Sequence, residues 1–149
     1  DERSFYGMDL GLEYYFSSDL SGFFNYSWVS DNSFMQKVVG FEDQDPLPSY
    51  LNIPKNKFRI GLNYNPEVGF NGSISFQHDD SYFAAAGQFA GDTDPRNLVD
   101  LGLGYNMSSG LAISLAVQNA FNNEYRYLPN MPKIGRRAIA KIRYTFGGK

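Results

Sequence analysis

The 149-residue sequence contains no cysteine and a single histidine, His78. Without cysteine it can form neither a disulfide framework nor a thiolate metal site, and one imidazole provides no nucleophile–base set for catalysis. No run of about 18 uncharged apolar residues occurs, which excludes a membrane-spanning helix. The net charge of −3 leaves no basic surface for nucleic acid. We therefore predict that the chain is not an enzyme, has no cofactor or metal site, and binds no nucleic acid.

Aromatic residues and glycine are abundant, with 13 Phe, 11 Tyr and 15 Gly. The mean hydropathy is nevertheless −0.40, because the large apolar residues alternate with polar ones. Tyr, Phe, Val and Ile favour extended strands, and the clusters of Gly, Asn and Ser between them favour turns. For a chain of this length, the composition predicts one all-β unit.

Seven segments alternate between large apolar residues and small polar or charged ones. Successive side chains of a strand point to opposite faces, so each segment has one apolar and one polar face. In the last segment, Ile142 and Tyr144 fall on one face, whereas Lys141 and Arg143 fall on the other. The predicted strands are residues 5–16, 20–30, 56–65, 70–80, 97–107, 111–121 and 136–146.

This alternation fits two architectures: a soluble sandwich with apolar faces inside, and a transmembrane barrel with apolar faces against lipid. The connections favour the barrel. Three of them are the short "SSD", "NPEVG" and "SSG", and the others span roughly 25, 17 and 15 residues; this sorting is typical of outer-membrane barrels. The sandwich alternative predicts that Tyr14, Phe24, Leu62, Leu103 and Ile142 point into a protein core.

Aromatic residues gather at the end of the strands where the turns are short. A tyrosine has an apolar ring and a polar hydroxyl, so a row of them at one depth is typical of the boundary between hydrocarbon and headgroups. The predicted girdle consists of Tyr14, Phe16, Tyr64, Tyr105, Tyr144 and Phe146. Glycines on the polar face, such as Gly61 and Gly102, would ease curvature or let an internal element approach the wall.

We therefore predict an all-β fold, the wall of an antiparallel transmembrane β-barrel with about seven strands present. Bacterial single-chain barrels have even strand numbers, and an open sheet in lipid leaves the backbone groups of two edges unpaired. The wall is thus expected to be incomplete without further polypeptide, which could be the rest of the same protein or another subunit.

The segment "VQNAFNNEYRYLPNMPKIGRRAIAKIRYTF" resembles the C-terminal signature of TonB-dependent outer-membrane receptors. The matching positions are Val117, Asn119, Phe121, Glu124, Tyr125, Pro132, Gly135, Arg136, Tyr144 and Phe146. Upstream, "LNIPKNKFRIGLNY" is similar to the Pro-x-His-Lys strand start of that family, with Asn56 where His is common. The "GGK" after Phe146 is a departure, because the family usually ends there.

The resemblance implies that residues 1–149 are the C-terminal portion of such a receptor barrel. The complete receptor has a barrel of 22 strands and a plug. It imports a scarce nutrient, with energy coupled from the inner membrane. The implied partners are membrane lipid, including outer-leaflet lipid, the remaining receptor barrel and plug, and the barrel-assembly machinery, which reads the terminal Tyr-x-Phe. TonB would be contacted only through an N-terminal region absent from this sequence. The implied location is the outer membrane of a Gram-negative bacterium, with long loops extracellular and the C-terminus periplasmic. The alternative is a structural or adhesive outer-membrane barrel, either a small eight-stranded type or a subunit of an assembly, with no transport role.

Several residues are candidates for specific roles. Charges expected to face the lumen, where they could pair with the plug or with one another, are Asp9, Glu13, Arg59, Asp100, Arg137, Lys141 and Arg143. Candidate ligand-contacting loop residues are Tyr82, Phe83 and Phe89, which could instead pack on neighbouring loops. Glu42, Asp43 and Asp45 offer hard oxygen ligands for Ca²⁺, but their spacing fits a solvated acidic loop better. His78 is expected at the outer interface of the membrane.

Overall fold

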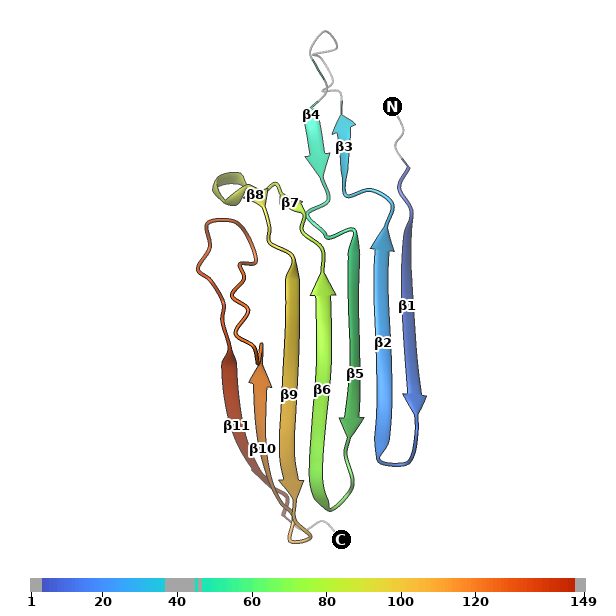
Figure 1. Ribbon diagram of the computed structural model, residues 1–149, viewed down its shortest axis with the longest axis vertical. Helices are drawn as coiled ribbons and strands as arrows, with labels where there is room; N and C mark the ends of the chain where they lie inside the picture. Colours follow the sequence, from blue (N-terminus) through green and yellow to red (C-terminus); the bar gives the residue numbers. More distant parts are fainter. Residues whose placement is uncertain (1–3, 37–44, 46, 147–149) are drawn as a thin grey trace.

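The computed structural model describes residues 4–36, 45 and 47–146. Its main feature is a seven-stranded antiparallel sheet in which strands follow one another in chain order (Figure 1). The strands are β1 (Gly7–Tyr15), β2 (Leu20–Val29), β5 (Asn56–Tyr64), β6 (Gly69–Asp79), β9 (Arg96–Asn106), β10 (Leu111–Gln118) and β11 (Arg137–Tyr144). Their ends lie within about three residues of the predicted ones, inside the usual uncertainty of strand boundaries.

The sheet does not close on itself. Strands β1 and β11 each pair with one neighbour only, β2 and β10 respectively. The prediction of an all-β, antiparallel barrel wall that is incomplete with seven strands is therefore confirmed.

The register of the sheet sorts side chains by polarity. One continuous cross-strand row consists of Leu12, Phe24, Ile60, Phe76 and Val99. The row directly beside it, on the opposite face, includes Asn25, Arg59 and Gln77. A shift of any strand by one residue would exchange these faces, so the alternation of polarity and the register reinforce each other.

Short turns connect the strands at one end of the sheet, which we call the short-turn end (Figure 1). In the β1–β2 turn, Ser17 Oγ accepts hydrogen bonds from the backbone N–H groups of Asp19 (3.3 Å) and Leu20 (3.1 Å). In the β9–β10 turn, Gly110 has a φ of +85°, a conformation that residues with a Cβ rarely adopt. These local bonds and the glycine explain why so few residues suffice to reverse the chain.

The opposite end, the long-loop end, carries two small hairpins that the sequence did not predict (Figure 1). One pairs β3 (Ser33–Gln36) with β4 (Leu47–Tyr50). The other pairs β7 (Phe83–Ala84) with β8 (Gly91–Asp92), with the one-turn 3₁₀ helix η1 (Gly87–Phe89) between them. Within the described ranges no helix has the length and hydropathy needed to cross a bilayer.

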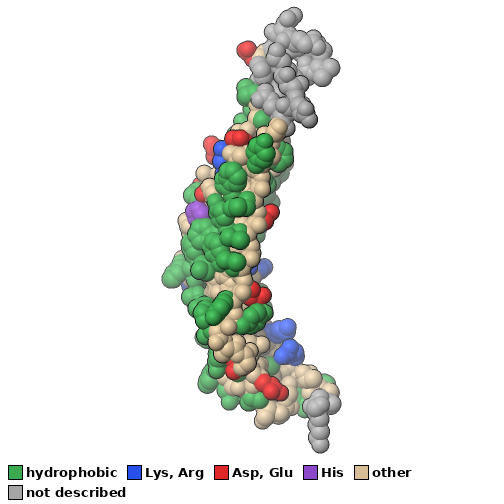
Figure 2. Space-filling model, turned by 90° about the vertical axis from the view of Figure 1, so that its right-hand side faces the viewer, with side chains coloured by type: hydrophobic (Ala, Val, Ile, Leu, Met, Phe, Trp, Pro, Cys, Tyr) green, Lys and Arg blue, Asp and Glu red, His purple; other side chains and the backbone are tan. Residues whose placement is uncertain are grey.

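The described part of the chain has almost no protein core. Ala84 is its only buried hydrophobic residue, whereas Phe70, Leu103 and Ile142 are 76%, 69% and 73% exposed. The sandwich alternative is therefore wrong, since no second layer covers the large apolar side chains. Figure 2 shows hydrophobic side chains gathered along one side of a thin, curved sheet.

Gly61 illustrates why a glycine is required in the middle of a strand. A Cβ at this position would lie 2.7 Å from two ring atoms of Phe23 and 2.8 Å from the backbone oxygen of Ile74. The Phe23 ring occupies the space above Gly61 on the polar face. The glycine thus accommodates a side chain of the neighbouring strand within the wall itself.

Candidate functional site

The polar face of the sheet is the surface on which charged side chains converge. Its members, as the register defines them, include Asp9, Glu13, Asn25, Lys57, Arg59, Asn63, Gln77, Asp79, Arg96, Asp100, Ser114, Gln118, Arg137, Lys141 and Arg143. All seven charges that the sequence analysis singled out lie on this face. The structure brings only two of them, Arg59 and Asp100, into an ion pair.

This ion pair crosses three strands. Arg59 Nη2 on β5 lies 3.6 Å from Asp100 Oδ2 on β9 and donates a hydrogen bond to Ser75 Oγ on β6, between them (3.1 Å). The second Asp100 oxygen accepts a hydrogen bond from the backbone N–H of Asn119 (2.9 Å). Asp100 therefore connects the centre of the wall to the end of β10.

A second ion pair lies closer to the long-loop end. Asp79 at the end of β6 is directly opposite Arg96 at the start of β9, and Arg96 Nη2 contacts Asp79 Oδ2. Gln77 Nε2 donates to the same oxygen (3.0 Å). The Asp79 side chain is 1% exposed, and its Oδ1 has no hydrogen-bond partner within the described structure. A carboxylate this deeply buried is tolerable because a guanidinium compensates its charge.

The β10–β11 loop folds back over this second ion pair. The Arg96 guanidinium carbon lies 5.6 Å from the ring centre of Tyr125 and 5.4 Å from that of Tyr127. Burial, followed by hydrogen bonding to Tyr127, raises the pKa of the Tyr125 hydroxyl to about 12. Between loop and sheet is a pocket of about 330 Å³ whose lining includes Gln77, Leu98, Asp100, Gln118, Tyr125 and Ile134.

Asparagines hold the two ends of the β10–β11 loop. Asn119 has a φ of +52°, and its side chain exchanges two hydrogen bonds with the backbone of Asn123 (2.9 and 2.8 Å). Asn122, with a φ of +55°, accepts a hydrogen bond from the backbone N–H of Arg136 (2.8 Å). Asparagine tolerates the left-handed region and bonds to nearby backbone, so the Asn-rich part of the C-terminal signature has a structural reason.

The flanks of the polar face differ from its centre. Arg137 Nε donates to Gln118 Oε1 (2.9 Å), but Lys141 and Arg143 have no polar partner within the described structure. On the other edge strand, Glu13 accepts a hydrogen bond from the Tyr15 hydroxyl (2.9 Å). The sequence analysis considered pairing of the β11 cations with Asp100, Asp9 and Glu13. That pairing is absent, because Asp100 pairs with Arg59 and the two acids lie on β1, at the other edge.

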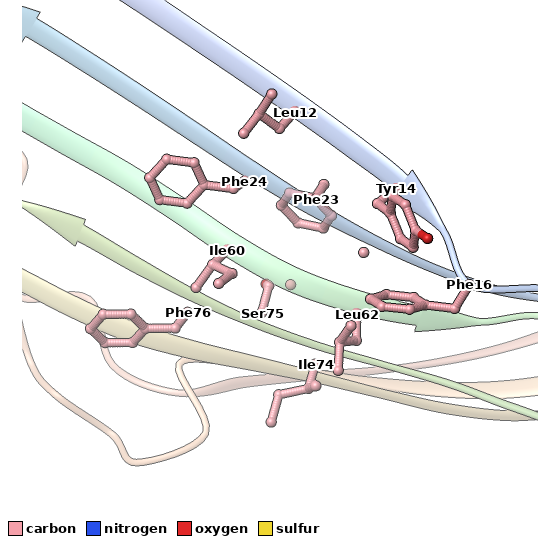
Figure 3. Close-up of a pocket in the computed structure, with 12 residues that line it drawn as sticks. Leu12, Tyr14, Phe16, Phe23, Phe24, Ile60, Leu62, Ile74, Ser75 and Phe76 are labelled. Carbon is pink, nitrogen blue, oxygen red and sulfur yellow. The ribbon is translucent and has the colours of Figure 1, made fainter.

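The apolar face is continuous except at the long-loop end. Its members include Met8, Leu10, Leu12, Phe24, Phe58, Ile60, Leu62, Ile74, Phe76, Leu101, Leu103, Leu115 and Ile142. A shallow hollow of about 480 Å³ lies in this face, lined largely by apolar side chains that include Leu12, Tyr14, Phe24, Ile60, Leu62 and Phe76 (Figure 3).

The predicted girdle residues lie around the short-turn end, and all of them except Tyr64 take part in aromatic ring pairs. Three edge-to-face ring pairs occur there: Tyr14 with Phe16, Phe70 with Tyr105, and Tyr144 with Phe146, with centroids 4.6–4.9 Å apart. Tyr64 is 47% exposed on the same face. Edge-to-face pairs of this kind add stability beyond the area that they bury.

A row of polar side chains interrupts the apolar face near the long-loop end. We call Tyr26, Asn56, Asp80, His78 and Asn97 the polar belt. The Tyr26 hydroxyl donates to Asn56 Oδ1 (2.7 Å), and Asn56 Nδ2 donates to Asp80 Oδ2 (2.7 Å). His78 contacts Asp80 Oδ1 through Nε2 (3.1 Å) and Asn97 Oδ1 through Nδ1 (2.7 Å). Polar groups thus satisfy one another along a line across the strands.

The aromatic loop residues do not form one cluster. Phe83 in β7 stacks on Tyr50 in β4 with ring centres 4.5 Å apart, so it packs against a neighbouring loop. Tyr82 flanks the same hairpin, and its backbone exchanges hydrogen bonds with the Thr93 side chain (3.0 Å each). Phe89 ends η1. The candidate calcium ligands Glu42 and Asp43 lie outside the described residues.

The sequence analysis did not single out Asp79 and Arg96, although they form the most buried ion pair of the described chain. Their positions in the sequence could have predicted the pair. Asp79 ends one strand, Arg96 begins the next strand of the sheet, and both side chains point to the same face. Pairing across neighbouring strands would then bring them together.

An open antiparallel wall with one exposed apolar face and one charged face defines the chain as a segment of a transmembrane β-barrel. The family described as "TonB dependent receptor-like, beta-barrel" matches residues 1–120. The chain therefore belongs to this family of outer-membrane receptor barrels. Residues 121–146, which carry most of the C-terminal signature, lie beyond the matched range, and no curated protein matches the chain.

Proposed function

We propose that this chain forms part of the wall of a TonB-dependent transporter, through which a nutrient enters after an energy-coupled rearrangement of a plug. The observation that carries the proposal is the combination of family membership with an apolar band of bilayer dimensions. On β6, Phe70 at the short-turn end and His78 in the polar belt are eight positions apart in the sequence. At 3.4 Å per residue and a tilt of about 40°, this distance corresponds to about 20 Å across the membrane, close to the apolar band of about 25 Å in known barrels.

The lengths of the connections support a proposed orientation of the wall in the membrane. Outer-membrane barrels have short periplasmic turns and long extracellular loops. The short-turn end, with the aromatic girdle and the C-terminus, is then periplasmic, and the β3–β4 and β7–β8 hairpins are extracellular. The polar belt lies at the headgroups of the outer leaflet. Tyr144 and Phe146 both anchor the last strand at the inner interface and provide the terminal residues for the barrel-assembly machinery.

The open edges require partners. Strands β1 and β11 would each expose a row of unpaired backbone groups to lipid, which costs several kcal/mol per group. Further strands of the same receptor complete the ring, and the plug occupies the pore on the polar side. TonB itself is contacted by a region outside this sequence.

The location of the two faces can be tested with paired cysteine labels, since the chain has no cysteine of its own. In a cysteine-free full-length receptor, Leu103→Cys on the apolar face and Asn63→Cys on the polar face would each carry a polarity-sensitive fluorophore. We expect a lipid-borne quencher to act on the label at position 103 and not on the label at position 63. Equal quenching at both positions would contradict the proposed arrangement.

The transport role needs a separate test. Deletion of the complete gene should abolish growth on, or uptake of, one scarce nutrient among a panel, and a protonophore should abolish that uptake in the parent strain. A structural or adhesive barrel would show the same labelling pattern but leave growth on every nutrient unchanged.

A further inference from the structure

The apolar face is not uniform, because the hollow described above lies in it across β1, β2, β5 and β6 (Figure 3). Gly22 belongs to its lining, and the register places Gly22 between Tyr14 on β1 and Leu62 on β5. A Cβ at position 22 would lie 3.1 Å from Leu62 Cδ2 and 3.1 Å from Phe16 Cε2. A residue without a side chain thus interrupts a row of large apolar residues, and the surface is concave there.

The hollow covers the depth of about one leaflet. One end is bounded by Tyr14 and Phe16 of the predicted girdle, whose rings form an edge-to-face pair with centroids 4.9 Å apart. Across the sheet the lining reaches Ile74, which lies midway between Phe70 and His78 on β6. The hollow therefore extends from the short-turn end to about the middle of the apolar band.

The size of the hollow matches one hydrocarbon chain. Its volume of about 480 Å³ accommodates on the order of 15 groups the size of a water molecule or a methylene, since each takes about 30 Å³. Further barrel strands would add in the plane of the sheet at β1 and β11, so they would not cover a hollow on its outer side.

Packing decides what such a hollow prefers inside a membrane. Lipid tails are as apolar as leucine, so association within the bilayer has no hydrophobic driving force and depends on van der Waals contacts. Atoms that line an unfilled gap lose those contacts. A chain that fits into a concave site therefore gains contacts that a chain crossing a flat part of the same face does not.

We propose that this hollow binds one acyl chain of a phospholipid from the leaflet at the short-turn end. Contact with lipid is common to the whole apolar face, whereas this chain occupies a defined site. The Tyr14 hydroxyl at the rim can donate a hydrogen bond to an ester or phosphate oxygen of the same lipid. The inference rests on the proposed location and orientation of the wall, but not on transport.

Photolabelling from within the bilayer tests the site. The full-length receptor is placed in phospholipid vesicles that contain a small fraction of a phospholipid with a diazirine in the middle of one acyl chain, and mass spectrometry locates the attached lipid. Leu62 and Ile74 in the hollow and Leu115 outside it are similarly exposed, at 45%, 49% and 46%. We expect the two hollow positions to be labelled about threefold more than Leu115, a preference of about 0.65 kcal/mol.

Filling the hollow should remove this preference. Gly22→Leu introduces a side chain whose Cβ meets only the ends of the Leu62 and Phe16 side chains at 3.1 Å, and these ends can move aside. Labelling at Ile74 should then fall to the level of Leu115. Ala138→Leu, which adds the same bulk on the apolar face of β11, is the matched control and should leave labelling at Ile74 unchanged.

Three results would overturn the inference: equal labelling of the three positions in the parent receptor, labelling that Gly22→Leu does not reduce, or a protein instead of a phospholipid joined to a photoreactive amino acid at position 62 in native outer membranes. The quencher experiment described above, repeated in the same vesicles, reports separately whether the apolar face contacts lipid. A receptor that fails the uptake test but keeps the labelling pattern would contradict the transport role alone.

Discussion

The same seven strands form both faces of the sheet, but the side chains of the two faces find their contacts in different places. On the apolar face, large residues such as Phe70 and Leu103 are more than two-thirds exposed, so an apolar medium outside the chain must cover them. On the polar face, Arg59 and Arg96 find aspartates within the wall. The difference shows that the described chain supplies its own electrostatic partners at the centre but relies on its surroundings to cover its apolar surface.

The polar face itself divides further. Its centre, on β5, β6 and β9, is paired internally, whereas the edge strand β11 carries Lys141 and Arg143 without partners in the described structure. The proposed arrangement, in which the sheet is one arc of a larger ring, would account for this division. Substitutions on each face and in each part of the polar face test these differences.

The largest effect is expected where a buried charge loses its partner. Asp79→Ala leaves the Arg96 guanidinium uncompensated beneath Tyr125 and Tyr127. Breaking a buried ion pair costs about 3–5 kcal/mol, so the urea midpoint of the folded receptor in vesicles should fall markedly. Asp9→Ala, an exposed acid on the same face, should change the unfolding free energy by no more than about 0.5 kcal/mol. Similar effects of the two changes would mean that the Asp79–Arg96 pair is not important for stability.

A charge on the apolar face should have a slightly smaller effect. Ile74 lies midway between Phe70 and His78 on β6 and is 49% exposed. We expect Ile74→Arg to destabilise the membrane-inserted receptor by about 2–4 kcal/mol, measured from urea unfolding in vesicles. Asn63→Arg on the polar face is the matched control and should be tolerated. If both arginines were tolerated equally, the apolar face would not be in contact with lipid.

A smaller effect is expected at the start of the β10–β11 loop. Asn119→Ala places a residue with a Cβ and no polar group at a φ of +52° and removes both bonds to Asn123. Left-handed strain of about 1–2 kcal/mol should loosen the loop without unfolding the sheet. Proteolysis between Asn119 and Arg136 measures this loosening, and Asn119→Gly, which keeps the conformation accessible, should be protected better than alanine. Equal protection of the two variants would show that backbone strain is not the cause.

The sequence alone determined the strands and their faces. Side-chain direction in a strand has a period of two residues, which is a local property, so alternation predicted all seven strands and placed every singled-out charge on the polar face. Short connections were equally readable, because turn residues such as Gly110 act through local backbone conformation. The β3–β4 and β7–β8 hairpins escaped prediction, since strands of two to four residues are too short to show alternation.

Which charged side chains form ion pairs depends on the tertiary structure. The order of the strands and their register determine whether Arg59 pairs with Asp100. The path of the long β10–β11 loop determines whether Tyr125 and Tyr127 fold back over Arg96. Those contacts join residues 29 to 41 positions apart. They depend on how the strands pair throughout the sheet, whereas the polarity of each face follows from the alternation of residue types within each strand.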